Sequence, residues 1–140
     1  MSSMDNQQQP YHHSEFMAFL SDADSVAVVA RYAALLKLPH PLIRQGAVDD
    51  AIAALSQVEQ APLRLMIDIS DSTDPLGDLA RLADACTTDI SVVVVASRTD
   101  VGLFRELLRM GVDDYLSKPL TVDLLRHTAV HPHRKATPCC

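Results

Sequence analysis

Two acidic residues and one lysine of this 140-residue chain have the chemical types that a phosphoryl-transfer site needs. Asp22 and Asp68 each follow a short apolar run, and Lys118 stands directly before a proline. Two carboxylates that lie close together repel each other and favour a divalent cation such as Mg²⁺, which takes oxygen ligands. A carboxylate beside Mg²⁺ can attack a phosphoryl group, and a lysine opposite offers a positive charge to the transferred phosphate. This chemistry requires a fold that brings the three side chains together.

The segment from Gly111 to Leu120 predicts the position of Lys118. Its residues are typical of a turn, a short strand, and then a lysine followed by a proline. Proline fixes its own φ and biases the residue before it toward extended backbone, so Lys118 is predicted at the rigid end of a strand. Because X-Pro bonds are the ones with an appreciable cis population, the bond between Lys118 and Pro119 is a candidate cis peptide.

Short apolar runs alternate with stretches of helical periodicity along the chain. Asp24 or Ser25 is expected to cap the first helix, and Asp100 the fourth. The predicted strands are 16–20, 42–44, 63–68, 90–95 and 113–117, and the predicted helices are 26–36, 48–58, 76–86, 101–110 and a last one from Thr121 or Asp123 to 128.

Five strands that alternate with five helices indicate right-handed crossovers and a parallel sheet covered on both faces. We therefore predict a three-layer α/β fold with a flavodoxin-like, five-stranded parallel sheet, and among the possible strand orders we choose 2-1-3-4-5. Ligands of such sheets bind beyond the carboxyl ends of the strands. Asp22, Asp68 and Lys118 follow three of these strand ends, so they are expected to converge on one site.

The length and composition favour one globular domain. We expect a disordered leader at 1–14, a folded domain at 15–130 and a flexible tail at 131–140. A net charge of −6 argues against nucleic-acid binding, and no apolar run is long enough for membrane insertion. There is no signal-peptide pattern, the three cysteines make no disulfide framework, and no histidine–cysteine set has zinc-ligand spacing. These features favour a cytoplasmic location.

The residues 111–119 resemble the "GxxDYLxKP" end of the receiver domains of bacterial response regulators, which are CheY-like. The resemblance covers about residues 16–128. It implies that Asp68 is the phospho-acceptor, that Asp22 and Asp68 bind Mg²⁺, and that Lys118 contacts the phosphate. It also implies that Tyr115 is the aromatic side chain that rotates between signalling states, and that a histidine kinase is the phosphodonor.

The chain departs from the receiver pattern at several positions. Ser21 stands where receivers carry the first of two adjacent acids; Asp24 is a possible substitute, although a helix cap explains it better. Ala96 matches the Thr or Ser whose hydroxyl contacts the phosphoryl group, and Ser97 would point to the other face of the strand. Without that hydroxyl, Tyr115 is more simply interpreted as a half-buried strand aromatic. The acceptor and the lysine are kept, while cation binding and switching stay open.

Residues 16–22 and 98–116 resemble the atypical receiver at the front of TadZ/CpaE-type pilus-assembly proteins. In that family the receiver-like domain precedes an ATPase domain and helps to place the protein at a cell pole. The chain has only four glycines and no Gly-rich Walker loop, so the resemblance covers only the front part of that family. The expected partner is a histidine kinase or a pilus-assembly protein, and a homodimer through residues 101–128 is possible.

Three functional hypotheses follow. The first is an atypical receiver of a phosphorelay or pilus-assembly system that acts mainly through protein contacts, with Mg²⁺-dependent self-phosphorylation of Asp68 as its only possible catalytic act. The alternative is a stand-alone response regulator that accepts phosphate from a kinase. A flavodoxin-like cofactor binder is a weaker hypothesis, because acids at Asp22 and Asp24 replace a phosphate-binding loop. The alternative to a functional role for Asp68 is a solvated acid in a loop after a strand.

Overall fold

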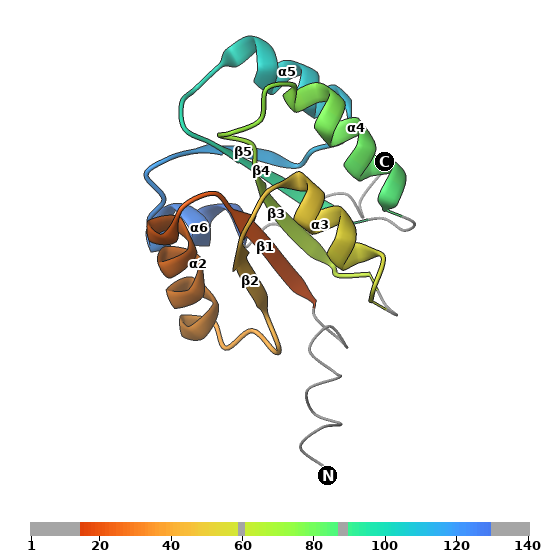
Figure 1. The fold of residues 1–140 in the computed structure, drawn as a ribbon. Helices are drawn as coiled ribbons and strands as arrows, with labels where there is room; N and C mark the ends of the chain where they lie inside the picture. The colour runs from red at the N-terminus through yellow and green to blue at the C-terminus, as the bar shows by residue number, and fades with distance from the viewer. Residues whose placement is uncertain (1–14, 59–60, 87–89, 130–140) are drawn as a thin grey trace, which may run out of the picture.

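The computed structural model describes residues 15–58, 61–86 and 90–129. It confirms the predicted α/β class and strand order, because the sheet has five parallel strands in the order β2-β1-β3-β4-β5 (Figure 1). The predicted leader and tail lie outside the described residues. The strands are β1 (Phe16–Leu20), β2 (Leu42–Gln45), β3 (Arg64–Asp68), β4 (Ser91–Ala96) and β5 (Asp114–Ser117).

In the described part of the chain, five helices cover both faces of the sheet. They are α2 (Ala23–Leu35), α3 (Val48–Leu55), α4 (Pro75–Ala85), α5 (Val101–Arg109) and α6 (Val122–Ala129). Helices α2 and α6 lie on one face, and α3, α4 and α5 lie on the other (Figure 1). Within 15–58, 61–86 and 90–129, none of these helices has the length and apolar character that crossing a bilayer would need.

The central strands β1, β3 and β4 are largely apolar because their side chains enter two separate cores. In β1, Met17 and Phe19 pack with α3, α4 and α5, whereas Ala18 and Leu20 pack with α2 and α6. All five residues of β1 are buried. A central parallel strand has no solvent-facing side, so an alternating polar pattern would place polar groups in one of the cores.

Helix α2 begins earlier than the sequence predicted, and the residue that caps it is different. Asp22, rather than Asp24 or Ser25, is the N-cap, and its Oδ2 accepts a hydrogen bond from the backbone N–H of Ser25 at 2.9 Å. A carboxylate at this position satisfies an N–H that has no partner inside the helix. The cap on the fourth predicted helix is as expected, at Asp100. The acid directly after β1 is therefore also part of a helix terminus.

The connection into β5 fixes the place of Lys118. Gly111 has φ +102°, a conformation that L side chains rarely adopt, and it turns the chain from α5 into β5. Beyond β5 the backbone N–H of Lys118 donates to the carbonyl of Ala96 at 2.9 Å, which extends the pairing with β4 by one residue. The peptide bond between Lys118 and Pro119 is cis.

Replacing Tyr32 with phenylalanine is expected to raise the free energy of unfolding by about 1 kcal/mol, because a buried hydroxyl without a partner is costly. Tyr32 lies in α2 with no exposed surface, and within the described residues its hydroxyl has no hydrogen-bond partner. Urea denaturation of both proteins measures the difference. Tyr115→Phe is the matched control: the Tyr115 hydroxyl donates to the carbonyl of Arg98, so its removal should not stabilise the fold. A less stable Tyr32→Phe would contradict this expectation.

Candidate functional site

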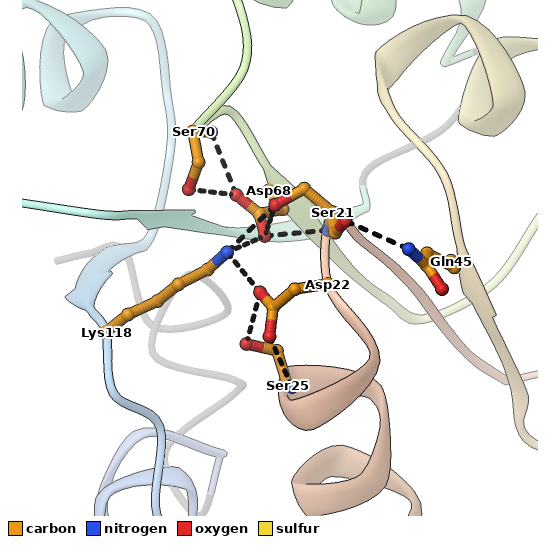
Figure 2. Close-up of polar contacts among 7 residues, drawn as sticks. All are labelled: Ser21, Asp22, Ser25, Gln45, Asp68, Ser70 and Lys118. Carbon is orange, nitrogen blue, oxygen red and sulfur yellow. Dashed lines mark hydrogen bonds and ion pairs between the residues drawn. The ribbon is translucent and has the colours of Figure 1, made fainter.

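The carboxyl ends of β1, β3 and β5 bring the three predicted site residues together (Figure 2). Lys118 extends from the end of β5 so that its Nζ lies 2.7 Å from Asp68 Oδ2 and 2.5 Å from Asp22 Oδ1. Asp22 and Lys118 are 96 positions apart in the chain, and Asp68 lies between them in sequence. The parallel sheet therefore brings Asp22, Asp68 and Lys118 together at one edge although they are far apart in the sequence.

Asp68 is fully buried, and both of its oxygens accept hydrogen bonds. The backbone N–H and the hydroxyl of Ser21 donate to Oδ2 at 2.8 and 2.9 Å. The backbone N–H and the hydroxyl of Ser70 donate to Oδ1 at 2.8 and 2.6 Å. Burial alone would raise the pKa of Asp68, but hydrogen bonds from Lys118, Ser21 and Ser70 outweigh it and lower the pKa. Asp68 is thus a carboxylate anion and no solvated loop acid.

Lys118 is held as an ammonium ion between the two acids. Its side chain is 16% exposed, and besides both carboxylates its Nζ contacts the hydroxyl oxygen of Ser21 at 2.9 Å. Burial lowers the pKa of Lys118, but its contacts with Asp22 and Asp68 outweigh burial and raise the pKa. A lysine ammonium has three N–H donors, and here three oxygens surround it.

The side chain of Asp22 both caps helix α2 and pairs with Lys118. Its side chain caps α2 through both polar groups of Ser25, whose hydroxyl donates to Oδ1 at 2.9 Å, and the same oxygen contacts Lys118. The hydrogen bond from Lys118 is the main reason why the pKa of Asp22 falls to about 2. Asp22 is the most open of the three charged groups, with 42% of its side chain exposed.

As arranged here, these residues do not fit a bound divalent cation. Mg²⁺ prefers oxygen ligands, and the two carboxylates that the sequence predicts as its ligands, Asp22 and Asp68, are bridged by Lys118. The described part of the chain also contains no group of three or more His, Cys, Asp or Glu side chains placed to hold a metal. A cation between Asp22 and Asp68 would have to take the place of the lysine ammonium.

Sequence reasoning missed the serines that complete this site. The sequence identifies Ser21 only as a departure from the receiver pattern, and it indicates no role for Ser70 at the site. Ser70 had a local signal, because a residue two positions after an Asp commonly donates its N–H to that carboxylate. Ser21 had none: its contact with Asp68 spans 47 residues and arises only when β1 and β3 pair.

The predicted switch positions lie at the ends of β4 and β5. Ala96 is buried at the end of β4 and offers no hydroxyl, and Ser97 is exposed just beyond that strand. The hydroxyl of Tyr115 donates to the backbone carbonyl of Arg98 at 3.0 Å, and its ring packs on Phe104. The side chain of Tyr115 thereby attaches the loop after β4 to β5, and the methyl side chain of Ala96 makes no polar contact.

A second contact holds the same loop. The hydroxyl oxygens of Thr99 and Ser117 lie 2.7 Å apart, at hydrogen-bonding distance. Together with the Tyr115 hydroxyl, this pair fixes the loop before α5 to β5 without any phosphoryl group.

No protein-family model matches this chain, and no curated protein matches it either. Solved structures do match. The chain in a crystal structure of the pilus assembly protein CpaE of Caulobacter crescentus is 27% identical with a TM-score of 0.73, and the match covers 82% of this chain and 95% of that chain. The chain in a crystal structure of a CpaE2 pilus assembly protein of Sinorhizobium meliloti is 28% identical with a TM-score of 0.71, over 84% of this chain and 97% of that chain.

The chain has a CheY-like receiver fold and is similar to CpaE. This confirms the resemblance predicted from residues 16–22 and 98–116. A response regulator of Burkholderia pseudomallei, solved with a phosphorylated aspartic acid and a calcium ion, is 16% identical with a TM-score of 0.61, over 89% of this chain and 75% of that one. At that identity the comparison supports the receiver fold alone.

The receiver-like fold is expected to lose stability in acid through Asp22 and Asp68. Both folded-state pKa values are lowered, so the two carboxylates stabilise the fold above their unfolded pKa of about 4, and this contribution disappears as the pH falls toward 2. Urea midpoints measured from pH 6 to pH 3 should fall steadily. In Lys118→Met the carboxylates lose the partner that lowers their pKa, so the decline should be smaller. Equal declines in both proteins would contradict this assignment.

Proposed function

We propose that this chain is an atypical receiver domain that acts mainly through protein–protein contacts in a pilus-assembly or polar-localisation system. The observation that carries the proposal is the state of Asp68: five protein donors occupy its two oxygens. A carboxylate that accepts so many hydrogen bonds is a poor nucleophile, since attack on phosphorus would require several of them to break.

The lack of a hydroxyl at Ala96 also supports a receiver domain that acts through protein contacts. A receiver that switches needs a group that registers the phosphoryl oxygens and moves the loop before α5. Here residue 96 has no hydroxyl, and the loop is already attached to β5 by Tyr115 and by the pair Thr99 and Ser117. We infer one persistent conformation of the surface formed by α5, β5 and α6, which suits a constitutive contact.

That surface is also where we place a possible homodimer. Val101 is the first residue of α5 and Leu108 lies two turns later, and 58% and 43% of their surface is exposed. A Leu108→Glu substitution should shift a dimer to monomers in sedimentation experiments, because a charge would have to be buried in the contact. Leu35→Glu on α2, where the leucine is 62% exposed, is the matched control and should leave the oligomeric state unchanged. A wild-type monomer at high concentration would remove the dimer from the proposal.

The experiment that tests the proposed function is localisation of a fluorescent fusion in the native cells. If protein contacts suffice, Asp68→Asn should keep the polar focus at a temperature where circular dichroism shows that the purified variant is folded. A folded Asp68→Asn that loses the focus would mean that the acceptor carboxylate itself is needed, and the proposal would fail.

The second candidate is a phospho-accepting response regulator that a histidine kinase switches, with Mg²⁺ bound at Asp22 and Asp68. The juxtaposition of Asp68 with Lys118 favours it, because a lysine beside the acceptor can stabilise a transferred phosphoryl group. Incubation with a small phosphodonor and Mg²⁺, followed by mass spectrometry, separates the two candidates. Addition of one phosphoryl group that Asp68→Asn abolishes would favour the second candidate, and an unchanged mass would favour the first.

A further inference from the structure

The ammonium of Lys118 has the contacts that a metal ion between two carboxylates would have. Its Nζ touches one oxygen of Asp22, one oxygen of Asp68 and the hydroxyl of Ser21, at 2.5, 2.7 and 2.9 Å. In Figure 2 the side chain reaches from β5 into the space between the two acids. The three donors of the ammonium therefore match three oxygens, and one positive charge offsets part of the charge of the pair.

Ser21 completes this arrangement because a hydroxyl can donate and accept at the same time. It donates to Asp68 Oδ2 at 2.9 Å and accepts from Lys118 at 2.9 Å. A carboxylate at position 21 could only accept, and it would add a third negative charge next to Asp22 and Asp68. One ammonium could not balance three carboxylates, and a divalent cation would then be favoured.

The remaining oxygens of the two acids are also used. Asp68 Oδ1 accepts from the N–H and hydroxyl of Ser70, and Asp22 Oδ2 accepts from the N–H of Ser25. Each of the four carboxylate oxygens thus has a protein donor. To bind Mg²⁺ here, the site would have to displace Lys118 and leave a largely buried ammonium without its partners, which is costly.

We propose that Lys118 is a built-in counter-ion that makes this centre independent of divalent cations. With Ser21 it forms a clamp, made of Lys118, Ser21, Asp22 and Asp68, that joins the chain segments after β1, β3 and β5. The clamp uses the two acids for structure and leaves no place for Mg²⁺ between them.

The backbone amides of Ser21 and Ser70 report directly on the clamp, because both donate to Asp68. We would titrate MgCl₂ into the full 140-residue chain at constant ionic strength and follow these two amides by NMR. The expected result is no saturable shift at millimolar Mg²⁺. A saturable shift of both amides in the wild-type protein would overturn the proposal.

Two variants test whether the clamp residues are what excludes the cation. Ser21→Asp should gain a saturable response to Mg²⁺ and a melting temperature that rises with Mg²⁺ concentration, because ligand binding to the folded state stabilises it. Ser97→Asp adds the same charge just beyond β4, outside the clamp, and should gain neither. Lys118→Met should also gain the response if it folds. If Ser21→Asp and Lys118→Met fold and both stay insensitive to Mg²⁺, the counter-ion role of Lys118 is wrong.

The clamp does not depend on which partner the domain binds. Localisation of the fusion protein and the Mg²⁺ titration therefore give independent answers, and the failure of one leaves the other standing.

Discussion

Replacing Lys118 with methionine should lower the free energy of unfolding by about 3 kcal/mol, as removal of one partner from a buried ion pair commonly does. Methionine has a similar length, so the change removes the charge and the three donors rather than the packing. Asp68, whose side chain has no exposed surface, would keep its negative charge without the ammonium, and Asp22 would face it across the gap. Urea denaturation at pH 7 measures the loss.

Lys37→Met is the matched control, because Lys37 is exposed in the turn after α2 and removal of its charge should change stability by less than about 0.5 kcal/mol. If Lys118→Met is as stable as this control, the contacts of Lys118 with the two acids contribute nothing to the fold. The clamp would then have no role in the stability of the fold.

Replacing Asp68 with asparagine should cost about 2 to 3 kcal/mol, because the amide cannot accept on both sides. One side of the carboxylate receives the N–H and hydroxyl of Ser70, and the other receives the two groups of Ser21 and the ammonium of Lys118. Whichever way the amide turns, its own N–H₂ faces donors. Urea denaturation gives the size of the effect.

A double-mutant cycle separates the pair from its surroundings. Asp68→Asn and Lys118→Met should together cost less than the sum of the single changes, because both remove the same contact. Additive losses would show that Asp68 and Lys118 stabilise the fold independently. Asp71→Asn controls for the loss of one acid, since Asp71 lies exposed in the loop after β3 and outside the clamp.

The stability of the Asp68 and Lys118 variants decides how a loss of polar localisation is interpreted. A change at Asp68 that abolishes polar localisation can act through lost stability as well as through lost phosphorylation. Measuring the stability of Asp68→Asn is thus a condition for using it as a test of function. The Mg²⁺ response of Ser21→Asp provides a readout that lost stability alone would not produce.

Periodicity and turn residues predict the α/β class and the order of helices and strands along the chain, whereas the strand order within the sheet is a choice that the structure confirms. The apolar runs 16–20, 63–68 and 90–95 predicted strands within one or two residues of β1, β3 and β4, because strands buried on both faces must be apolar throughout. The start of α2 was missed by three residues. The reason is that Asp22, Asp24 and Ser25 are all good capping residues, and only the path of the chain out of β1 selects Asp22.

The sequence by itself determined the α/β class, the strand ends and the three charged residues that meet there, since parallel strands all place their carboxyl ends on one edge. Only the tertiary structure decided what those residues do to each other. Whether Asp22 and Asp68 share a cation or a lysine depends on distances of 2.5 to 2.9 Å between segments that are dozens of residues apart. Contacts of that kind leave no periodicity in the sequence, because they arise from strand pairing and not from neighbouring residues.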